Sequence, residues 1–592
     1  MERQICWSAA WGRRCLTLCA LILTASLAFA GSRKLSRELE NANPGSTVDV
    51  IVQYRQAPTA LHHQKVLNRG GRLRRELGLV KGGAYSLPAS ALADLAADPD
   101  VAYISPNHPV KGMLDLTAAA VNASAAWSSG YTGAGVGVAV IDSGIAPHSL
   151  FIDATGKLRV VYAQDFTGDT NTLNLEDAYG HGTHVAGIIG AKSSTTVFPA
   201  GGRNLQGIAP GVTLLNLRAL KSDGTGTDSS VIAAIQKAIA LKSQYNIRVI
   251  NLSLGRPVYE SYTQDPLCQA VESAWKAGIV VVVAAGNYGR NNSGGISGYG
   301  TITAPGNDPY VITVGAMKTL ATPTRADDLI ASYSSKGPSL YDHVVKPDLV
   351  APGNQVVSVG PASTYNSGVS LWDNYASTQI LDTYYCPTCW PAYDTWYYRL
   401  SGTSMATPVV SGAAALLLQQ HPTLTPDQVK ARLMKTAYKT FPRYSTATDP
   451  VTGLSYTSQY DIFTVGAGYL DIQAALSNTD LAPTTAGSAL SPTVTKDASG
   501  NIVVVNGTSV VWGTSVAWGT SVVWGTSVVW GTTSSGQSVA WGSSVVWGTS
   551  TTQGYSVVWG TGTNGTVNPY SVVWGTNTGL VDSMSVLTQG EN

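Results

Sequence analysis

Continuous apolar runs interrupt the polar background of the central chain, at 136–142 (VGVAVID), 212–220 (VTLLNLRAL), 247–255 (IRVINLSLG) and 279–287 (IVVVVAAGN). A helical pattern, SSVIAAIQKAIALKS, occupies 229–243 between two of these runs. Strands that are apolar throughout are buried on both faces, which is typical of a parallel sheet covered by helices. The pattern therefore predicts an α/β fold, a parallel β-sheet flanked by helices.

The regions on either side have different patterns. VDVIVQYRQ (48–56), a helical stretch and the segment 84–110 predict strand, helix, strand, helix and strand, which indicates a small α+β domain. A linker is expected at 479–507, followed over 508–592 by repeats of the SVVWGT type. The first four repeat tryptophans recur every six residues, which favours short strands with every tryptophan on one face. A β-rich region is predicted there, and the alternative is a purely structural tail.

Residues 1–30 have the pattern of an export signal. Arginines precede the apolar run CLTLCALILTASLAFA, which ends in an A-x-A-like site at Ala30. The run is shorter than the roughly 20 residues needed to span a bilayer, so a signal peptide is favoured over a retained anchor. Arg13-Arg14 leaves both the general and the twin-arginine export routes open. The mature protein is expected to be secreted or attached to the cell surface.

Composition adds few constraints. The chain has 592 residues, a formal net charge of +1 and 12% charged residues, which gives no indication of nucleic-acid binding. Cys6, Cys15 and Cys19 would leave with the signal peptide. Cys386 and Cys389, in CPTC, are expected to form a small disulfide loop, with Cys268 unpaired and buried.

Three blocks contain the residues needed for nucleophilic catalysis, namely VAVIDSGI around Asp142, HGTHVAG around His181 and GTSMATP around Ser404. A serine hydroxyl is a poor nucleophile unless a base removes its proton, and His181 is the candidate base. A buried carboxylate such as Asp142 would fix the imidazole tautomer and stabilise its cationic form. The apolar run that ends in Gly286-Asn287 adds Asn287 as a candidate oxyanion donor, together with the backbone N–H of Ser404.

These blocks, together with NLSLG (251–255) and SKGP…KPDLVAPG (335–353), resemble the subtilase family of serine proteases over roughly 120–475. The Asp, His, Ser order is the subtilisin order. The resemblance implies a serine endopeptidase that forms an acyl-enzyme on Ser404 and needs no cofactor for catalysis, and the signal pattern at 1–30 implies that it is secreted. It also implies an inhibitor-like propeptide at 31–115, removed on maturation by a cut between Pro106 and Ala120, ahead of a catalytic domain at 116–478.

The resemblance also implies two backbone edges that pair with an extended polypeptide substrate. The matching residues are Lys221, Gly224 and Gly226 on one edge, and Leu252, Ser253, Leu254 and Gly255 on the other. Tyr288 stands next to Asn287, and no acidic cluster for a basic P1 residue is evident, so an apolar or aromatic P1 residue is favoured. An aromatic-rich insertion at 362–398 is a candidate rim of the substrate site, with packing onto the catalytic domain as the alternative.

Several alternatives remain open at this level. His181 and His184 stand three apart on a predicted helix, with Glu176 and Asp177 nearby, which is a spacing that can bind a metal. No recognisable loop supports a structural calcium ion. A narrow-specificity processing protease and a surface-binding protein that acts through its WG repeats are the competing functions. An independent accessory domain is the alternative to a propeptide.

Overall fold

The computed structural model describes residues 34–36, 39, 42–107, 113–169, 177–192, 205–292, 296–360, 379–380, 397–449, 452–496, 502–505, 527–530, 539–542, 586–587 and 591. The chain divides into two compact units, Met1–Val110 and Lys111–Asn592. The predicted signal peptide, the CPTC pair and most of the WG repeats lie outside the described residues.

The first unit is built on a four-stranded antiparallel sheet in the order β2-β3-β1-β4. Its elements are β1 (Thr47–Tyr54), α3 (Ala60–Leu67), β2 (Arg72–Leu77), β3 (Gly82–Pro88), α4 (Leu92–Ala97) and β4 (Val101–Pro106). Val50, Val52, Leu87 and Ile104 form part of its own core. The predicted strand, helix, strand, helix, strand order is confirmed, with one strand missed.

The missed strand is β2, whose sequence RLRREL has no run of apolar residues. It lies at an edge of the sheet and pairs only with β3 among the described residues, so most of its side chains are exposed. Charged residues are common on edge strands because they prevent pairing with other chains. An edge strand of this kind carries little of the hydrophobic pattern from which strands are predicted.

The second unit contains an eight-stranded sheet in the order β11-β10-β9-β8-β5-β7-β6, with β12 also paired to β10. The strands are β5 (Gly137–Asp142), β6 (Val160–Asp165), β7 (Thr213–Arg218), β8 (Ile247–Leu252), β9 (Val280–Ala284), β10 (Ile312–Lys318), β11 (Leu329–Ile330) and β12 (Leu349–Pro352). All pairs are parallel except β10 with β11. The four predicted apolar runs form β5, β7, β8 and β9, which confirms the sequence interpretation.

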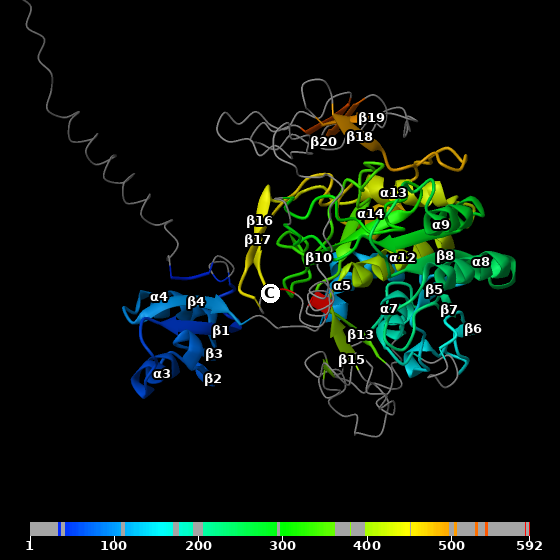
Figure 1. Cartoon of the computed structure of the whole chain (residues 1–592). Coiled ribbons are helices and arrows are strands. Elements are labelled where there is room, and N and C mark those ends of the chain that lie inside the picture. The colour runs from blue at the N-terminus through cyan, green and yellow to red at the C-terminus, as the bar shows by residue number, and fades with distance from the viewer. Residues whose placement is uncertain are drawn as a thin grey trace, which may run out of the picture. The chain divides into compact units, whose positions relative to one another are not determined.

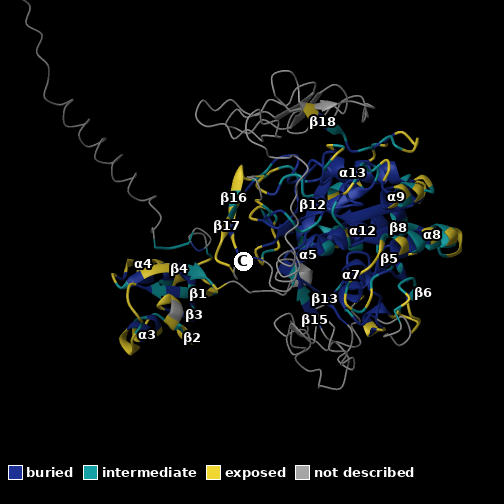
Figure 2. Ribbon diagram, viewed as in Figure 1, coloured by how far each residue is buried: buried dark blue, intermediate teal, exposed yellow. Residues whose placement is uncertain are grey.

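Helices flank this sheet. They are α5 (Met113–Ala120), α6 (Ala123–Ser128), α7 (His181–Gly190), α8 (Asp228–Tyr245), α9 (Pro266–Lys276), α12 (Thr403–Gln420), α13 (Pro426–Thr436) and α14 (Ile472–Ser477). Every residue of β5 is buried, and because side chains alternate along a strand, both faces of the sheet are covered. Figure 2 shows the central strands and α12 as buried, whereas α8 and α9 have exposed outer surfaces.

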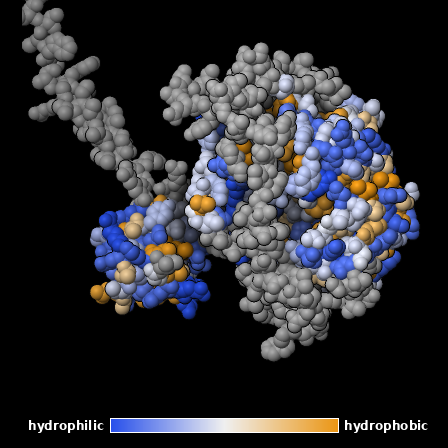
Figure 3. Space-filling model, in the orientation of Figure 1, coloured by the Kyte–Doolittle hydropathy of each residue, from blue (hydrophilic) through white to orange (hydrophobic). Residues whose placement is uncertain are grey.

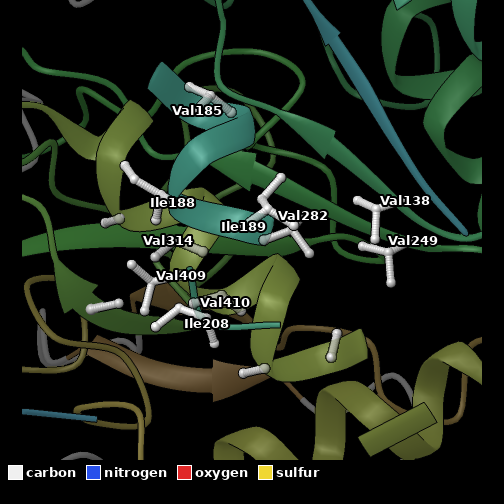
Figure 4. Close-up of a cluster of buried hydrophobic side chains, with 14 of the residues drawn as sticks. Val138, Val185, Ile188, Ile189, Ile208, Val249, Val282, Val314, Val409 and Val410 are labelled. Carbon is white, nitrogen blue, oxygen red and sulfur yellow. The ribbon is translucent and has the colours of Figure 1, made fainter. Parts of the chain in front are cut away.

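The largest core cluster joins α7 and α12 to the strands. Val185, Ile188 and Ile189 of α7 belong to the same buried cluster as Val409 and Val410 of α12 (Figure 4). All five side chains are fully buried. This packing fixes the two helices against the sheet and therefore fixes the residues at their amino ends.

The second unit also contains shorter antiparallel strand pairs, several of which are labelled in Figure 1. They are β13 (Val356–Val359) and β14 (Gln379–Ile380) on β15 (Tyr397–Leu400), β16 (Tyr444–Thr448) with β17 (Ser455–Gln459), β18 (Thr493–Lys496) with β19 (Ile502–Val505), and β20 (Ser527–Trp530) with β21 (Val539–Gly542). The last pair consists of two WG-repeat segments, and Val528 lies opposite Trp541.

The described part of the predicted linker differs from an extended spacer. Ala482 and Ala489 are buried beside α13, where Gln428 Nε2 donates to the Ala482 carbonyl at 2.8 Å. The N–H of Ala489 donates to the Asp427 carboxylate at 2.8 Å. In this part of the segment expected to be a linker, small residues allow the chain to pack closely on a helix.

The described surface of the second unit mixes hydrophilic residues with scattered hydrophobic ones (Figure 3). Among the described residues, no helix is both long and apolar enough to cross a membrane.

Candidate active site

The predicted site residues come from strands whose carboxyl ends share one edge of the sheet. Asp142 ends β5, Ser253 follows β8, and Asn287 lies just beyond β9. These three strands are adjacent and parallel in the order β9-β8-β5. Parallel strands bring residues that follow them to one edge, which is where open α/β sheets bind their ligands.

Asp142 and His181 are in direct contact. His181 is the first residue of α7, and its Nδ1 lies 2.7 Å from Asp142 Oδ1. His181 is only 6% exposed, and Asp142 is only 1% exposed. Because an ionised carboxylate only accepts hydrogen bonds, Nδ1 must donate, which leaves Nε2 of the neutral ring with a lone pair for accepting a proton.

Burial and charge act in opposite directions on the His181 imidazole. Burial disfavours the charged ring, but the charge and hydrogen bond of Asp142 outweigh it, and Asp177 adds a smaller effect. The net result is a pKa for His181 that is raised above the ordinary 6.5. A raised pKa makes His181 a stronger base.

Asp177 holds the backbone at the start of α7, where His181 lies. Its carboxylate accepts hydrogen bonds from the backbone N–H of Gly180 and Thr183, both at 2.7 Å, and from Ser143 Oγ at 2.8 Å. Ser143 Oγ in turn accepts from the N–H of Gly182 at 2.9 Å. From the sequence, Asp177 is expected only as a possible metal ligand. Its position four residues before His181 is the signal that could have identified this role.

Ser404 lies in the first turn of α12, which begins at Thr403. The Ser404 hydroxyl donates to the Ser253 carbonyl at 3.1 Å, and the Ser253 hydroxyl donates to the Ser404 carbonyl at 2.7 Å. This reciprocal pair joins the amino end of α12 to the end of β8. The free N–H groups and the dipole at a helix amino end favour negative charge at this position.

Asn287 contacts the block that contains Ser404. Its Oδ1 accepts from the N–H of Thr403 at 2.9 Å and from Thr403 Oγ1 at 3.1 Å. Its Nδ2 lies beside Gly402, 3.1 Å from where a side-chain Cβ would stand. Thr403, which the sequence analysis did not single out, therefore orients the Asn287 amide and leaves its N–H₂ group as a donor.

The predicted substrate edges occupy different environments. Lys221 closes a tight turn by donating from its N–H to the Thr225 carbonyl at 2.7 Å, and Gly224 and Gly226 belong to this turn. Leu252 and Ser253 are buried, whereas Leu254 is partly exposed and Gly255 is exposed. Tyr288 is partly buried, and its N–H donates to Ser335 Oγ at 3.0 Å.

His184 is buried on α7, and its Nε2 lies 3.0 Å from the Tyr398 carbonyl. Burial is the main reason that its pKa is lowered to about 3. Within the described ranges, no group of three or more His, Cys, Asp or Glu side chains could hold a metal ion. Glu176, which the metal alternative also used, lies outside the described residues.

Comparison with known proteins shows that a chain with this fold is a serine endopeptidase. The family model described as "Subtilase family" matches residues 133–475, and the chain belongs to that family. Subtilases act on polypeptides and need no cofactor for catalysis.

Individual relatives agree with the family assignment. The chain is 36% identical to "Serine protease AprX" of Bacillus subtilis (strain 168) over 338 residues, which covers 55% of this chain and 67% of the relative. It is 32% identical to "Subtilisin E" of the same organism over 428 residues, covering 71% and 92%. It is 33% identical to "Extracellular serine proteinase" of Thermus sp. (strain Rt41A) over 372 residues, covering 60% and 70%.

Proposed function

We propose that this protein is an endopeptidase in which Ser404 is the nucleophile, His181 the general base and Asp142 the carboxylate that orients His181. The observation that carries the proposal is the buried 2.7 Å contact between His181 and Asp142 at the edge of the sheet where Ser404 also lies. Asn287 Nδ2 and the N–H of Ser404 would donate to the developing oxyanion.

In the proposed reaction, Ser404 Oγ attacks the peptide carbonyl carbon and its proton moves to His181 Nε2. To do this, the hydroxyl must first turn from the Ser253 carbonyl toward the imidazole. His181 then gives the proton to the leaving amine, and an acyl-enzyme remains on Ser404. Water, activated by the same histidine, hydrolyses the acyl-enzyme and restores Ser404.

The proposal extends to substrate binding. The turn at 221–226 and the segment 252–255 would pair with an extended polypeptide. Leu254 and Gly255 supply the accessible part of the second edge. Backbone pairing gives broad specificity, with an apolar or aromatic P1 residue favoured beside Tyr288.

The finer features of maturation and location are also part of the proposal. We infer that residues 1–30 direct export and that the four-stranded first unit is an inhibitory propeptide removed after folding. The separate core of that unit supports the propeptide, and the similarity to an "Extracellular serine proteinase" of Thermus sp. supports export. The WG repeats would contact a surface or polymer.

A comparison of the wild-type chain with Ser404→Ala tests this function. Both are expressed as residues 31–592, and release of an amino-terminal fragment and hydrolysis of casein are measured. The wild type is expected to release the fragment and cleave casein, and the variant to do neither, because only the wild type has a nucleophile. If the wild type still does not cleave casein after its first unit is removed by another protease, the WG repeats become the candidate functional region.

A further inference from the structure

The described residues beyond the repeat region pack into the catalytic unit (Figure 1). We refer to Val586, Leu587 and Glu591 as the distal segment. Val586 is 2% exposed and belongs to the main core. The Leu587 carbonyl accepts from the N–H of Ser401 at 2.8 Å. The catalytic unit is therefore completed by residues that follow the WG repeats in the sequence.

The carboxylate of Glu591 is enclosed by donors from three chain segments. Arg290 Nη2 lies 2.7 Å from Oε1, and Lys318 Nζ lies 3.3 Å from Oε2. The N–H of Ser332 is 3.1 Å from both oxygens, and Ser332 Oγ also contacts Oε1. The Glu591 side chain is completely buried, and those of Arg290 and Lys318 are 4% and 3% exposed.

The backbone of Glu591 is bound as fully as its side chain. Its N–H donates to Asn354 Oδ1 at 2.8 Å. Its carbonyl accepts from Asn354 Nδ2 at 2.7 Å and from Gln355 Nε2 at 3.0 Å. The site therefore satisfies both the backbone and the side chain of Glu591.

Charge makes this contact important for the catalytic unit. Arg290 and Lys318 are two buried cations, and Asp449 pairs with Arg290 alongside Glu591. Removing one partner of a buried ion pair is strongly destabilising, because it leaves an uncompensated charge away from water. Of the two acidic residues that balance Arg290 and Lys318, Glu591 comes from beyond the repeats and Asp449 from before them.

The charged cluster, which consists of Arg290, Lys318, Asp449 and Glu591, is linked to both parts of the proposed oxyanion site. Arg290 lies in the same loop as Asn287, three residues further along the chain. On the other side, Asn354 follows Gly353, whose carbonyl accepts from the N–H of Gly402 at 2.8 Å. Gly402 lies two residues before Ser404. The segments that contain Asn287 and Ser404 therefore meet around Glu591.

We propose that Arg290, Lys318, Ser332 and Asn354 form a binding site for an acidic peptide segment, which the distal segment fills with Glu591. Its docking positions the Asn287 loop and the Ser404 block for catalysis, a step that rests on the function proposed above. Glu591 is a positioning residue in this scheme. Efficient proteolysis would consequently require a chain that extends through the WG repeats.

The test compares Glu591→Gln with the wild-type chain, and Glu260→Gln serves as the matched control. Glu260 is only partly buried and lies outside the cluster. kcat and KM are measured on a short peptide, per active site, at a temperature where both variants are folded. Glu591→Gln is expected to lower kcat by about tenfold or more with little change in KM, because it removes one charge from a buried cluster.

Docking itself is measured by hydrogen exchange in the full-length Ser404→Ala chain, which does not depend on activity. Slow exchange of the Glu591 and Ser401 amides is expected, with fast exchange of both when Glu591→Gln is added. Hydrogen exchange therefore tests the docking of the distal segment even if Glu591→Gln alone fails to fold, or if the wild type proves not to be a protease. Fast exchange of the Glu591 amide in the Ser404→Ala chain overturns the proposal. A kcat equal to that of Glu260→Gln overturns it too, even if the unfolding temperature falls.

Discussion

His181 illustrates how individual residues are tuned in this site. Its ring is buried, which by itself would favour the neutral form, yet the adjacent Asp142 raises its pKa above 6.5. His148, which is buried without such a carboxylate partner, has a pKa lowered to about 4. The contrast indicates that the direction of the shift is set by the neighbouring charge.

Substitution of Asp142 gives a prediction at this scale. A general base works in its neutral form, so kcat/KM should fall as the pH drops through the raised pKa of His181. Asp142→Asn removes the charge that raises this pKa, and the acid limb of the pH profile should move to lower pH. The rate itself should fall about 10⁴-fold, as for the corresponding change in other serine proteases.

The control for this experiment is Asp153→Asn. The Asp153 carboxylate binds Thr155 and Lys157 within an exposed turn. Its loss should leave both the rate and the acid limb unchanged. An Asp142→Asn acid limb at the wild-type pH would show that His181 is not the titrating base.

At the scale of elements, the site depends on where helices begin and strands end. α7 begins at His181 and α12 one residue before Ser404, so both side chains lie at helix amino ends. The adjacent turn at 221–226 contacts this region through Gly224, which has φ of +80°. A Cβ at Gly224 would stand 2.5 Å from the ring of Tyr179.

Gly224→Ala should therefore weaken substrate binding. The substitution places a side chain in the left-handed region, which costs about 1 kcal/mol. It also pushes on Tyr179, two residues before His181. We expect KM for a peptide substrate to rise several-fold. Gly156→Ala is the matched control, because Gly156 has φ of +83° but open space around it. An equal KM in the two variants would argue against a role for this turn in binding.

At the scale of the whole molecule, the chain forms two units with separate cores. The first has its own sheet and a core that includes Val52, which is fully buried in β1. A unit with its own core can fold independently of the rest of the chain. This property is needed for a propeptide that remains folded after it is cut.

A separately produced fragment of residues 31–110 should inhibit the matured protease in a saturable way. Inhibition of casein hydrolysis is measured as the fragment concentration rises. Val52→Asp, which buries an unpaired carboxylate in the core of the fragment, should abolish the effect by unfolding it. A folded fragment that leaves hydrolysis unchanged would indicate an accessory domain in place of a propeptide.

The sequence by itself determined the central strands, the helix predicted at 229–243 and the family. Buried parallel strands need continuous apolar runs, and the blocks around Asp142, His181 and Ser404 have local signatures that do not depend on the rest of the chain. The edge strand β2 was not predicted, because its exposed charged residues do not form a continuous apolar run.

Only the tertiary structure decided which distant groups meet. The support of His181 by Asp177, the orientation of Asn287 by Thr403 and the burial of Glu591 between Arg290 and Lys318 all depend on contacts made after the sheet has assembled. Hydrogen bonds and ion pairs act over a few ångströms, and residues far apart in the chain reach that distance only through the packing of the whole core.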